Sequence, residues 1–431
     1  MLQPYWDFWE KSVPFDLRAD RAALADGVRA ALDVDWVEPG GAEAILVLQT
    51  MATPPTPTFE QLGALPVVVW AAHRPGGLDP GFDHGSVTAE GATVGAPMLT
   101  SVLVREGRPF ELVVGRIDDP DVIGQVEQAL TAAAASVRLR RARVGRVGRP
   151  LDGYACVDTD DGLLRRGAGV ELVSIDPAEL TALYRSVVPS RVRELDAEVK
   201  AEYLVEIEGD ELERSLRVAL AIDDLVARYQ LDAGAMNCHV AEIRFGEEIG
   251  VTPCFGLGRS TTAGVPWTCV GDVLTAVAML SGKLLGGAAQ YHELEAIDYD
   301  TGELVIASSG EFDLHFGAQA RPRLIRNGWF AGDPRCGACA CFAGPAGPAT
   351  LIAFAQVGDA YRLIAAEGEL TGRAFPATGT ANGGFRFAQG LDGWTAWCRA
   401  GANHHGSATP GAFGRAVEVL GRMAGIEAVC V

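Results

Sequence analysis

Acidic side chains gather between residues 252 and 316, at the ends of short apolar segments where a strand or helix gives way to a loop. Glu293 and Glu311 are two of them. Ligands of open α/β sheets bind at such element ends, and clustered carboxylates can hold a divalent cation. Together with His404 and His405 near the end of the chain, these acids predict a site that is assembled from three distant segments.

The elements that must position these residues follow from hydrophobic spacing. Three continuous apolar runs lie at 44–49, 65–71 and 110–114. Runs of this kind, separated by helical or proline-rich connections, are typical of a parallel sheet that is covered on both faces. Helical spacing over 18–32 and 119–136 supplies the covering layers. The first part of the chain, residues 1–140, is therefore predicted to be a doubly wound, Rossmann-like α/β domain.

A second Rossmann-like α/β domain is predicted over residues 141–285. Its middle segment, 191–229, carries leucines and valines at heptad-like spacing, which indicates a pair of long helices. Asp272 is placed to cap the last helix. The predicted strands and helices of this domain otherwise cover 170–175, 177–187, 235–240 and 272–283.

The pattern changes beyond residue 286, where helical periodicity nearly disappears. Short strands at 304–307, 349–356 and 361–369 alternate with glycine and proline. This spacing is typical of an all-β sandwich or barrel. Residues 286–431 are therefore predicted to form a C-terminal antiparallel β-barrel-like domain, with a helix at 411–423 and a last strand at 427–431.

Composition excludes several classes of function. A net charge of −20 over 431 residues repels a phosphate backbone, so nucleic acid is not an expected partner. No run approaches the roughly 18 apolar residues that a membrane helix needs. The N-terminal segment lacks the apolar core of a signal peptide, and nine cysteines, an odd number, fit a reducing compartment. We expect a cytoplasmic protein with no membrane partner.

Two further clusters have plain structural interpretations. The arginine-rich run 138–149 is a solvated helix end that leads into a strand, with an anion or partner-subunit patch as the alternative. Cys336, Cys339 and Cys341 are small side chains on a buried strand. A closed zinc site there would need a fourth ligand, and none is evident.

Several stretches resemble, in order and spacing, the L-arabinose/L-fucose isomerase superfamily. They are Gly95-Ala-Pro-Met-Leu-Thr-Ser, Arg143-Val-Gly-Arg-Val-Gly, the block from Pro253-Cys through Gly264-Val-Pro to Cys269-Val-Gly-Asp272, and Ala400-Gly-Ala-Asn-His-His405. The resemblance implies a divalent cation, typically Mn²⁺, a sugar or polyol substrate, and aldose–ketose interconversion through a cis-enediol. It also implies a homo-oligomer, trimer or hexamer, whose sites are shared between subunits. The proline-rich segment 51–58, expected as a loop, would then reach a neighbouring site.

The resemblance also implies which residues of this chain stand at the family's site positions. It places the first family carboxylate at Val270, which can neither bind a hard cation nor accept a proton. It places the second at Glu293, and it places a metal-ligand imidazole of the family at Glu311, where a carboxylate stands instead. The late histidine falls on His404 or His405, with His405 slightly favoured. Glu293, Glu311 and one imidazole then form a two-carboxylate, one-histidine donor set that suits manganese, iron or zinc. The two acids are also the expected catalytic residues, because a carboxylate pair can move a proton between neighbouring carbons.

Other residues are weaker candidates. His292 and Asp313 are expected to support the ligands from a second layer. His239 and Arg259 are expected to contact substrate, although each has a structural alternative, a strand-end histidine and a surface arginine. Asn382 either lines the pocket or forms an ordinary turn.

Three functions remain open. The leading hypothesis is a metal-dependent sugar isomerase. Since Val270 removes one acid, a related metal-assisted reaction that needs a single acid/base group is the next, for example epimerisation, carbon–carbon cleavage or decarboxylation. The third is a sugar-binding protein of the same fold without turnover.

Overall fold

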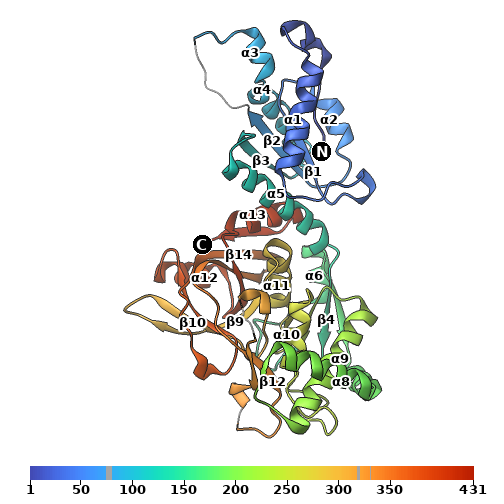
Figure 1. Cartoon of the computed structure of the whole chain (residues 1–431), viewed down its shortest axis with the longest axis vertical. Helices are drawn as coiled ribbons and strands as arrows, with labels where there is room; N and C mark the ends of the chain where they lie inside the picture. The colour runs from blue at the N-terminus through green and yellow to red at the C-terminus, as the bar shows by residue number, and fades with distance from the viewer. Residues whose placement is uncertain (74–79, 318–320, 331) are drawn as a thin grey trace. The chain divides into compact units, whose positions relative to one another are not determined.

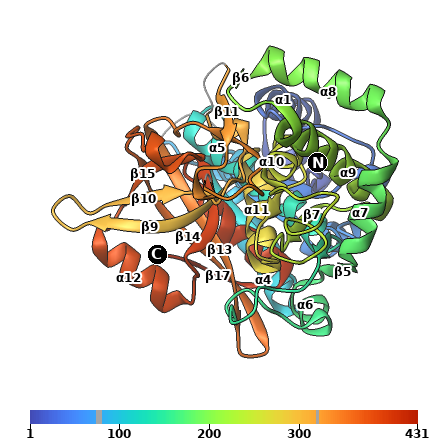
Figure 2. The same cartoon turned by 90° about the horizontal axis from the view of Figure 1, so that it is seen from below.

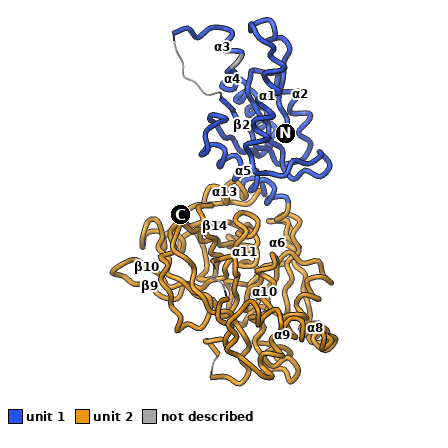
Figure 3. The backbone as a smooth tube through the Cα atoms, in the orientation of Figure 1, with its two compact units in different colours: residues 1–137, 422–424 blue, residues 138–421, 425–431 orange. Residues whose placement is uncertain are grey.

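The computed structural model describes residues 1–73, 80–317, 321–330 and 332–431. The chain forms two compact units, residues 1–137 with 422–424 and residues 138–421 with 425–431 (Figure 3). The predicted division into three domains, 1–140, 141–285 and 286–431, stays a prediction.

The first unit is built on a three-stranded parallel sheet in the order β1-β2-β3 (Figure 1). Its strands are β1 (Ile45–Gln49), β2 (Val67–His73) and β3 (Phe110–Arg116). Its helices are α1 (Leu17–Ala31), α2 (Pro55–Gln61), α3 (His84–Ala89), α4 (Ala92–Arg105) and α5 (Pro120–Leu139), with short 3-10 turns η1 (Asp7–Ser12) and η2 (Pro39–Gly41). The predicted strands are confirmed to within two or three residues at each end.

Both faces of this sheet are apolar, which is why its strands read as unbroken hydrophobic runs. Alternate side chains of a strand point to opposite faces. Val68 and Trp70 pack in one cluster with Val126 of α5, whereas Val67 and Val69 pack in another with Leu99 and Leu103 of α4. The sheet is thus the middle layer of three.

Two local predictions differ from the structure. The proline-rich segment after β1 forms helix α2, which begins at Pro55; proline is tolerated there because the first helical N–H groups have no partner in any case. The stretch His84–Arg105 is, by length and composition, apolar enough to cross a membrane, and 41% of it is buried inside the unit. Its α4 part buries Leu99 and Leu103 against the sheet.

The second unit begins with a four-stranded parallel sheet in the order β5-β4-β7-β8. The strands are β4 (Arg143–Val147), β5 (Glu171–Ile175), β7 (Ala233–Met236) and β8 (Trp267–Thr268). The helices are α6 (Asp161–Ala168), α7 (Pro177–Ser186), α8 (Pro189–Glu202), α9 (Gly209–Tyr229), α10 (Cys254–Thr262) and α11 (Val273–Gly286). The predicted helix pair is α8 and α9. The strand predicted at 235–240 starts earlier and ends at Met236.

A small sheet in the order β12-β11-β6 joins distant segments of this unit. It contains β6 (Leu204–Val205), β11 (Arg323–Arg326) and β12 (Ala338–Cys341). Cys339 and Cys341 lie buried on β12, and Cys336 is buried just before it. This agrees with the interpretation of these cysteines as small side chains of a buried strand.

The rest of the second unit is a closed antiparallel barrel of six strands in the order β13-β16-β9-β10-β15-β14, closed by the β13–β14 pairing. The strands are β9 (Gln290–Asp298), β10 (Glu303–Ala307), β13 (Gly347–Val357), β14 (Ala360–Leu370), β15 (Asn382–Phe387) and β16 (His405–Pro410), with β17 (Glu427–Cys430) parallel to β14. Helices α12 (Leu391–Ala400) and α13 (Gly414–Ala424) and the turns η3 (Leu314–Phe316), η4 (Gly328–Phe330) and η5 (Pro376–Thr378) complete it. Figure 2 shows the β9–β10 hairpin extending outward. The predicted fold class, parallel α/β sheets followed by an antiparallel barrel, is confirmed.

Helix α11 connects the two sheets of this unit. It packs against β16 and β13 of the barrel and against β7 and β4 of the parallel sheet. Its first turn is held by Asp272, whose Oδ1 accepts a hydrogen bond from the Thr275 N–H at 2.9 Å. The predicted cap is therefore present, and it lies where α/β and β structure meet.

Candidate active site

The pairing of β9 with β16 brings Glu293 and His405 together. The two residues are direct partners in the antiparallel register, and such partners have neighbouring side chains on one face of the sheet. His405 Nε2 lies 4.0 Å from Glu293 Oε1. One ligand atom each from Glu293, His404 and His405 lies within 4.8 Å of the others. The strand pairing of the barrel thus brings together two of the three predicted segments, those of Glu293 and of His404 and His405.

Asp272 orients His405 from the start of α11. Its Oδ2 lies 2.7 Å from His405 Nδ1, and both side chains are almost completely buried. Burial alone would lower the pKa of His405, but the hydrogen bond to Asp272 and its charge outweigh burial and raise the pKa. With Nδ1 held by the carboxylate, Nε2 is the nitrogen on the Glu293 side, the arrangement in which a histidine serves as a metal ligand or proton carrier.

His404 occupies a different environment from its neighbour. Its ring is exposed, and its Nδ1 lies 2.7 Å from Asn403 Oδ1. Partial burial and the nearby His405 lower the pKa of His404. His404 is therefore the histidine more readily available as a neutral ligand, while His405 is the one fixed in position.

Glu293 is held by two hydroxyl groups. The Tyr291 hydroxyl donates to Glu293 Oε1 at 3.1 Å, and the Ser309 hydroxyl donates to the same oxygen. Tyr291 shares the strand face of Glu293 because it lies two residues earlier, and Ser309 follows the end of β10, whose Ala307 is paired with Glu293. Oε1 is therefore occupied within the protein, and Oε2 is the oxygen left for a ligand.

Glu311 lies on a tightly held loop between β10 and η3. The Gln290 amide donates to the Glu311 carbonyl at 3.1 Å and accepts from the Asp313 N–H at 2.9 Å. Gly310 precedes it with φ of 137°, and a side chain there would collide with Asn327 and Cys254. A glycine is needed at this point to turn Glu311 inward.

The Glu311 carboxyl is buried, and one of its oxygens lacks a hydrogen-bond partner among the described residues. It is 1% exposed, and its Oε2 has no hydrogen-bond partner in the described part of the chain. Burial, together with the charge of Glu293, raises its pKa to about 7. A buried carboxyl that titrates near neutrality can accept and return protons.

These residues fit a divalent cation. Glu293, His404 and His405 offer one carboxylate and two imidazoles, a donor set that suits manganese, iron or zinc. Glu311 is not part of the group that meets within 4.8 Å, although the charges of Glu293 and His405 act on it. The structure thus gathers both predicted histidines around Glu293 and leaves Glu311 beside them with an unpartnered oxygen.

Val270, where the resemblance predicts the first family carboxylate, is under backbone strain. Its φ is +49°, a left-handed conformation that is rare for a β-branched residue. Its side chain is buried in a small cluster with Cys269, Met279 and Tyr291. An apolar group therefore packs beside Tyr291, the residue whose hydroxyl donates to Glu293.

The three predicted substrate residues are engaged elsewhere. Arg259 of α10 forms an ion pair with Asp223 of α9. The Asn382 amide bonds to backbone groups, accepting from Phe375 N–H at 2.7 Å and donating to Thr380 O at 2.8 Å. His239 is half-buried, and burial and the charge of Arg244 lower its pKa. Their proposed contacts with substrate stay predictions.

The two predicted supporting residues also have other surroundings. Asp313 forms a buried ion pair with Lys283 at 2.6 Å and accepts from the Ala289 N–H at 2.7 Å. Both ring nitrogens of His292 are buried without a partner among the described residues. Burial lowers the pKa of His292 to about 3, which keeps this imidazole neutral.

Three residues that contribute to the site were not assigned from sequence: Asp272 as the partner of His405, Tyr291 and Ser309. Glu295 follows Glu293 by two residues outside this group, and burial together with the charge of Glu293 raises its pKa to about 7. The period of two along β9 could have revealed Tyr291 once β9 was known to be a strand. No local signal links Asp272 to His405, which lies 133 residues away.

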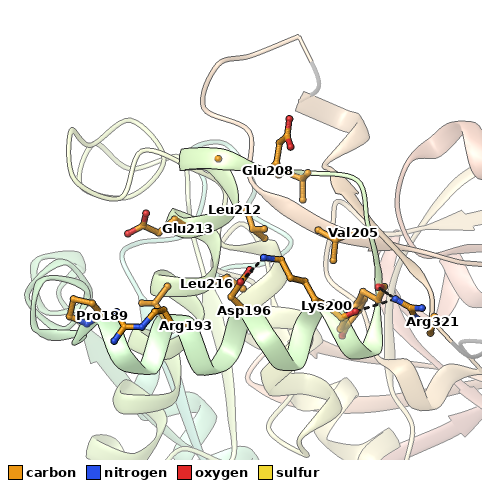
Figure 4. A pocket seen from close by; sticks show the side chains of 14 residues that line it. Pro189, Arg193, Asp196, Lys200, Val205, Glu208, Leu212, Glu213, Leu216 and Arg321 are labelled. Atoms are coloured by element: carbon orange, nitrogen blue, oxygen red, sulfur yellow. Dashed lines mark hydrogen bonds and ion pairs between the residues drawn. The ribbon is translucent and has the colours of Figure 1, made fainter.

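The second unit has several hollows, among them the following two. One of about 770 Å³ is bordered by α8, β6 and the start of α9, where Lys200 pairs with Asp196 at 2.6 Å and Arg321 donates to the Lys200 and Tyr203 carbonyls (Figure 4). The other, of about 1070 Å³, includes Leu274 and Asn403 in its lining. These two residues flank the site, since Asp272 and His404 are their close neighbours in sequence.

Comparisons with known proteins agree with this architecture. Residues 296–427 match the family model of the L-arabinose isomerase C-terminal domain. Over 343 residues the chain is 24% identical to the L-arabinose isomerase of Acidothermus cellulolyticus, and the aligned part covers 77% of this chain and 68% of that protein. The L-arabinose isomerase of a Nocardioides species is 25% identical, over 77% of this chain and 68% of its own length. That of Bifidobacterium adolescentis is 24% identical, over 76% of this chain and 67% of its own length. This chain is thus a distant relative of the L-arabinose isomerases, and its C-terminal part matches their C-terminal domain.

The family match places the site of this L-arabinose isomerase-like chain in context. Glu311, His404 and His405 lie within the matched residues 296–427, and Glu293 lies just before them on β9. The relatives align over far more of the chain than the barrel. The likeness therefore covers the α/β structure that carries Asp272 as well as the barrel wall that carries the possible ligands.

Proposed function

We propose that this chain acts on a sugar or sugar-like polyol with the help of a divalent cation, Mn²⁺ being the first candidate, and most simply as an aldose–ketose isomerase. The observation that carries the proposal is the meeting of Glu293, His404 and His405 within 4.8 Å, beside a buried carboxyl with an unpartnered oxygen. The likeness to L-arabinose isomerases supports the same reaction class.

The residues divide into two roles. Glu293, through Oε2, and the two histidines would hold the cation, which when bound supplies electrostatic stabilisation for negative charge that develops on the substrate oxygens. Glu311 takes the proton from the carbon next to the carbonyl and returns it to the neighbouring carbon. Asp272 keeps the His405 ring in one orientation. The Tyr291 and Ser309 hydroxyls keep the Glu293 carboxylate in one position.

A second candidate rests on Val270. With an apolar side chain at the first acid position, Glu311 is the carboxyl best placed to move protons, and one acid/base group suffices for epimerisation or for bond cleavage next to a carbonyl. Under this alternative the protein exchanges a substrate proton but forms no ketose. The third possibility, a sugar-binding protein without turnover, is an outcome of the same experiment.

The experiment begins with metal analysis of the purified chain before and after chelation and reloading with Mn²⁺. The reloaded protein is then incubated with aldoses and ketoses in deuterated water. Bound metal, deuterium at the carbon next to the carbonyl and a ketose product support the isomerase. Bound metal and exchange without a ketose support the single-base alternative. Sugar-dependent thermal stabilisation without exchange would leave only the binding protein.

The implied assembly belongs to the same proposal. We propose a cytoplasmic homo-oligomer, trimer or hexamer, in which segment 51–58 of a neighbouring subunit completes each site. Sedimentation of the purified chain tests it, and a monomer that turns over sugar at full rate would overturn it.

A further inference from the structure

We propose that the cavity of about 1070 Å³ beside the candidate active site is the substrate pocket, and that it selects uncharged and amino-bearing sugars over sugar phosphates and sugar acids. The inference rests on the proposed function and deepens it, because it names the substrate class. It concerns only residues of the second unit.

The cavity has the size and lining of a ligand site. Small-molecule pockets typically enclose about 300–1,000 Å³ and combine apolar walls with a few polar groups. Leu274 and Phe354, both about 95% buried, give the apolar part. Cys156, Gln356 and Asn403 add thiol and amide groups. The space is ample for one sugar ring and for a substituent on it.

The cavity adjoins the proposed ligands through Asn403. The Asn403 Oδ1 bonds to both the N–H and Nδ1 of His404. Its Nδ2 is buried and has no hydrogen-bond partner in the described part of the chain. An amide donor that is withdrawn from water and left without an acceptor is costly, and a sugar hydroxyl in the cavity supplies that acceptor.

The charge of the lining decides the class of ligand. Asp158, Asp160 and Asp161 border the cavity. Arg146 faces Asp158 at 3.7 Å and Asp161 at 3.8 Å, too far for hydrogen bonds. Asp160 accepts from a backbone N–H at the start of α6, and the Arg166 guanidinium lies close to it beside Gly162. Three carboxylates near two guanidinium groups leave an excess of one negative charge, which attracts an ammonium group and repels a phosphate or a carboxylate.

Cys156 provides a test that does not depend on turnover. This free, exposed thiol borders the cavity, whereas the exposed Cys398 and Cys430 do not. Alkylation by iodoacetamide, followed peptide by peptide in a mass spectrometer, is measured with neutral aldoses, 2-amino sugars, sugar phosphates and uronic acids. We expect amino sugars to protect Cys156 at the lowest concentration, neutral sugars next, and phosphates and acids not at all. Cys398 and Cys430 serve as internal references.

Variants distinguish the effect of the cavity's space from the effect of its charge. Asp158→Asn with Asp161→Asn is expected to weaken protection by amino sugars about five-fold, the ratio expected from one exposed charge pair at contact distance, and to leave neutral sugars unchanged. Asp392→Asn, an exposed acid on α12, is the matched control and should change nothing. Ala155→Trp fills the cavity from an exposed position and should abolish protection by every sugar. Thermal unfolding checks that each variant folds.

The failure of this proposal is distinguishable from failure of the proposed function. Equal protection by sugar phosphates and amino sugars, or turnover of sugars that never protect Cys156, overturns the pocket and leaves the function standing. Protection of Cys156 that follows the charge order, in a chain that binds no metal and exchanges no proton, supports the pocket and overturns the function.

Discussion

The barrel wall and the loops that face it contribute to the site in different ways. On the wall, β9 and β16 fix Glu293 opposite His405 through a hydrogen-bonded ladder. Facing them, the turn that carries Val270 and the loop that carries Glu311 depend on positive φ angles and on a few side-chain anchors. The wall supplies the possible ligands, and the loops supply the groups that would act on a substrate.

This difference shows how one fold can change its chemistry. Moving Glu293 away from His405 would require a register shift, which would turn every side chain of the strand to the other face. Exchanging a residue in a turn disturbs only its local contacts. Val270 lies in such a turn, with a left-handed backbone. We therefore expect substitutions on the wall to remove the cation and substitutions in the loops to change the reaction.

The largest effect is expected from Glu293→Gln. An amide keeps the shape of the side chain but loses the charge that attracts a cation. We expect metal content to fall to background and kcat/KM to fall roughly 10³-fold or more, because a cation contributes several kcal/mol of charge stabilisation. Metal analysis and turnover measure the two effects.

Glu295→Gln is the matched control for this change, since Glu295 lies on the same strand two residues later. It should alter turnover by less than about ten-fold, because it lies outside the group that meets within 4.8 Å. Full metal occupancy in Glu293→Gln would remove the barrel wall from the proposal.

Glu311→Gln should distinguish the role of the loop from that of the barrel wall. We expect metal content to be retained while kcat falls roughly 10²- to 10⁴-fold, the usual contribution of a general acid or base. Because burial raises the pKa of Glu311 to about 7, proton abstraction should increase as pH rises through 7, when the carboxyl loses its proton. That limb of the pH profile should be absent in the variant. Loss of metal in Glu311→Gln would instead make this residue a ligand.

The regular parts of the site could be predicted from sequence, and the contacts between them could not. The apolar runs 349–356 and 361–369 identified β13 and β14 because strand formation depends on local patterning. The pairing of β9 with β16, by contrast, joins residues more than 100 positions apart. The Asp272–His405 contact is equally remote, and only the helix cap of Asp272 had a local signal.

The substrate candidates were harder to place for another reason. Arg259 has the charge that suits an anionic ligand, but the identity of its partner depends on how α10 packs on α9, where Asp223 lies. Asn382 has an amide that suits a sugar, but neighbouring backbone groups satisfy it. Residue type alone does not tell which polar groups are already paired.

Val270→Glu introduces an acid into the turn and tests whether this turn can change the reaction. A further buried carboxylate near Glu293 costs about 3 kcal/mol or more when uncompensated, so the variant should unfold at a lower temperature in the presence of a chelator. Saturating Mn²⁺ should recover more stability in the variant than in the parent chain. Ketose formation should begin or increase if the chain is an isomerase.

Val270→Gln is the control, because it has the same length without the charge. It should show little dependence of its unfolding temperature on Mn²⁺ beyond that of the parent chain. If Val270→Glu and Val270→Gln behave alike, position 270 does not face the cation, and the proposed link between this turn and the site fails.

The smallest effect is expected from Tyr291→Phe, which removes one of the two hydroxyl donors to Glu293 Oε1. The Ser309 hydroxyl remains, so the carboxylate keeps one hydrogen-bond partner. We therefore expect the free energy of unfolding to fall by about 1 kcal/mol. We expect kcat/KM to fall by less than about ten-fold. Ser309→Ala should behave similarly. Because both donors serve one oxygen, the double variant should lose more than the sum of the two, by about 0.5–3 kcal/mol. A double-variant cycle measured by chemical denaturation checks this, and strictly additive losses would mean that the wall fixes Glu293 without help from the loop.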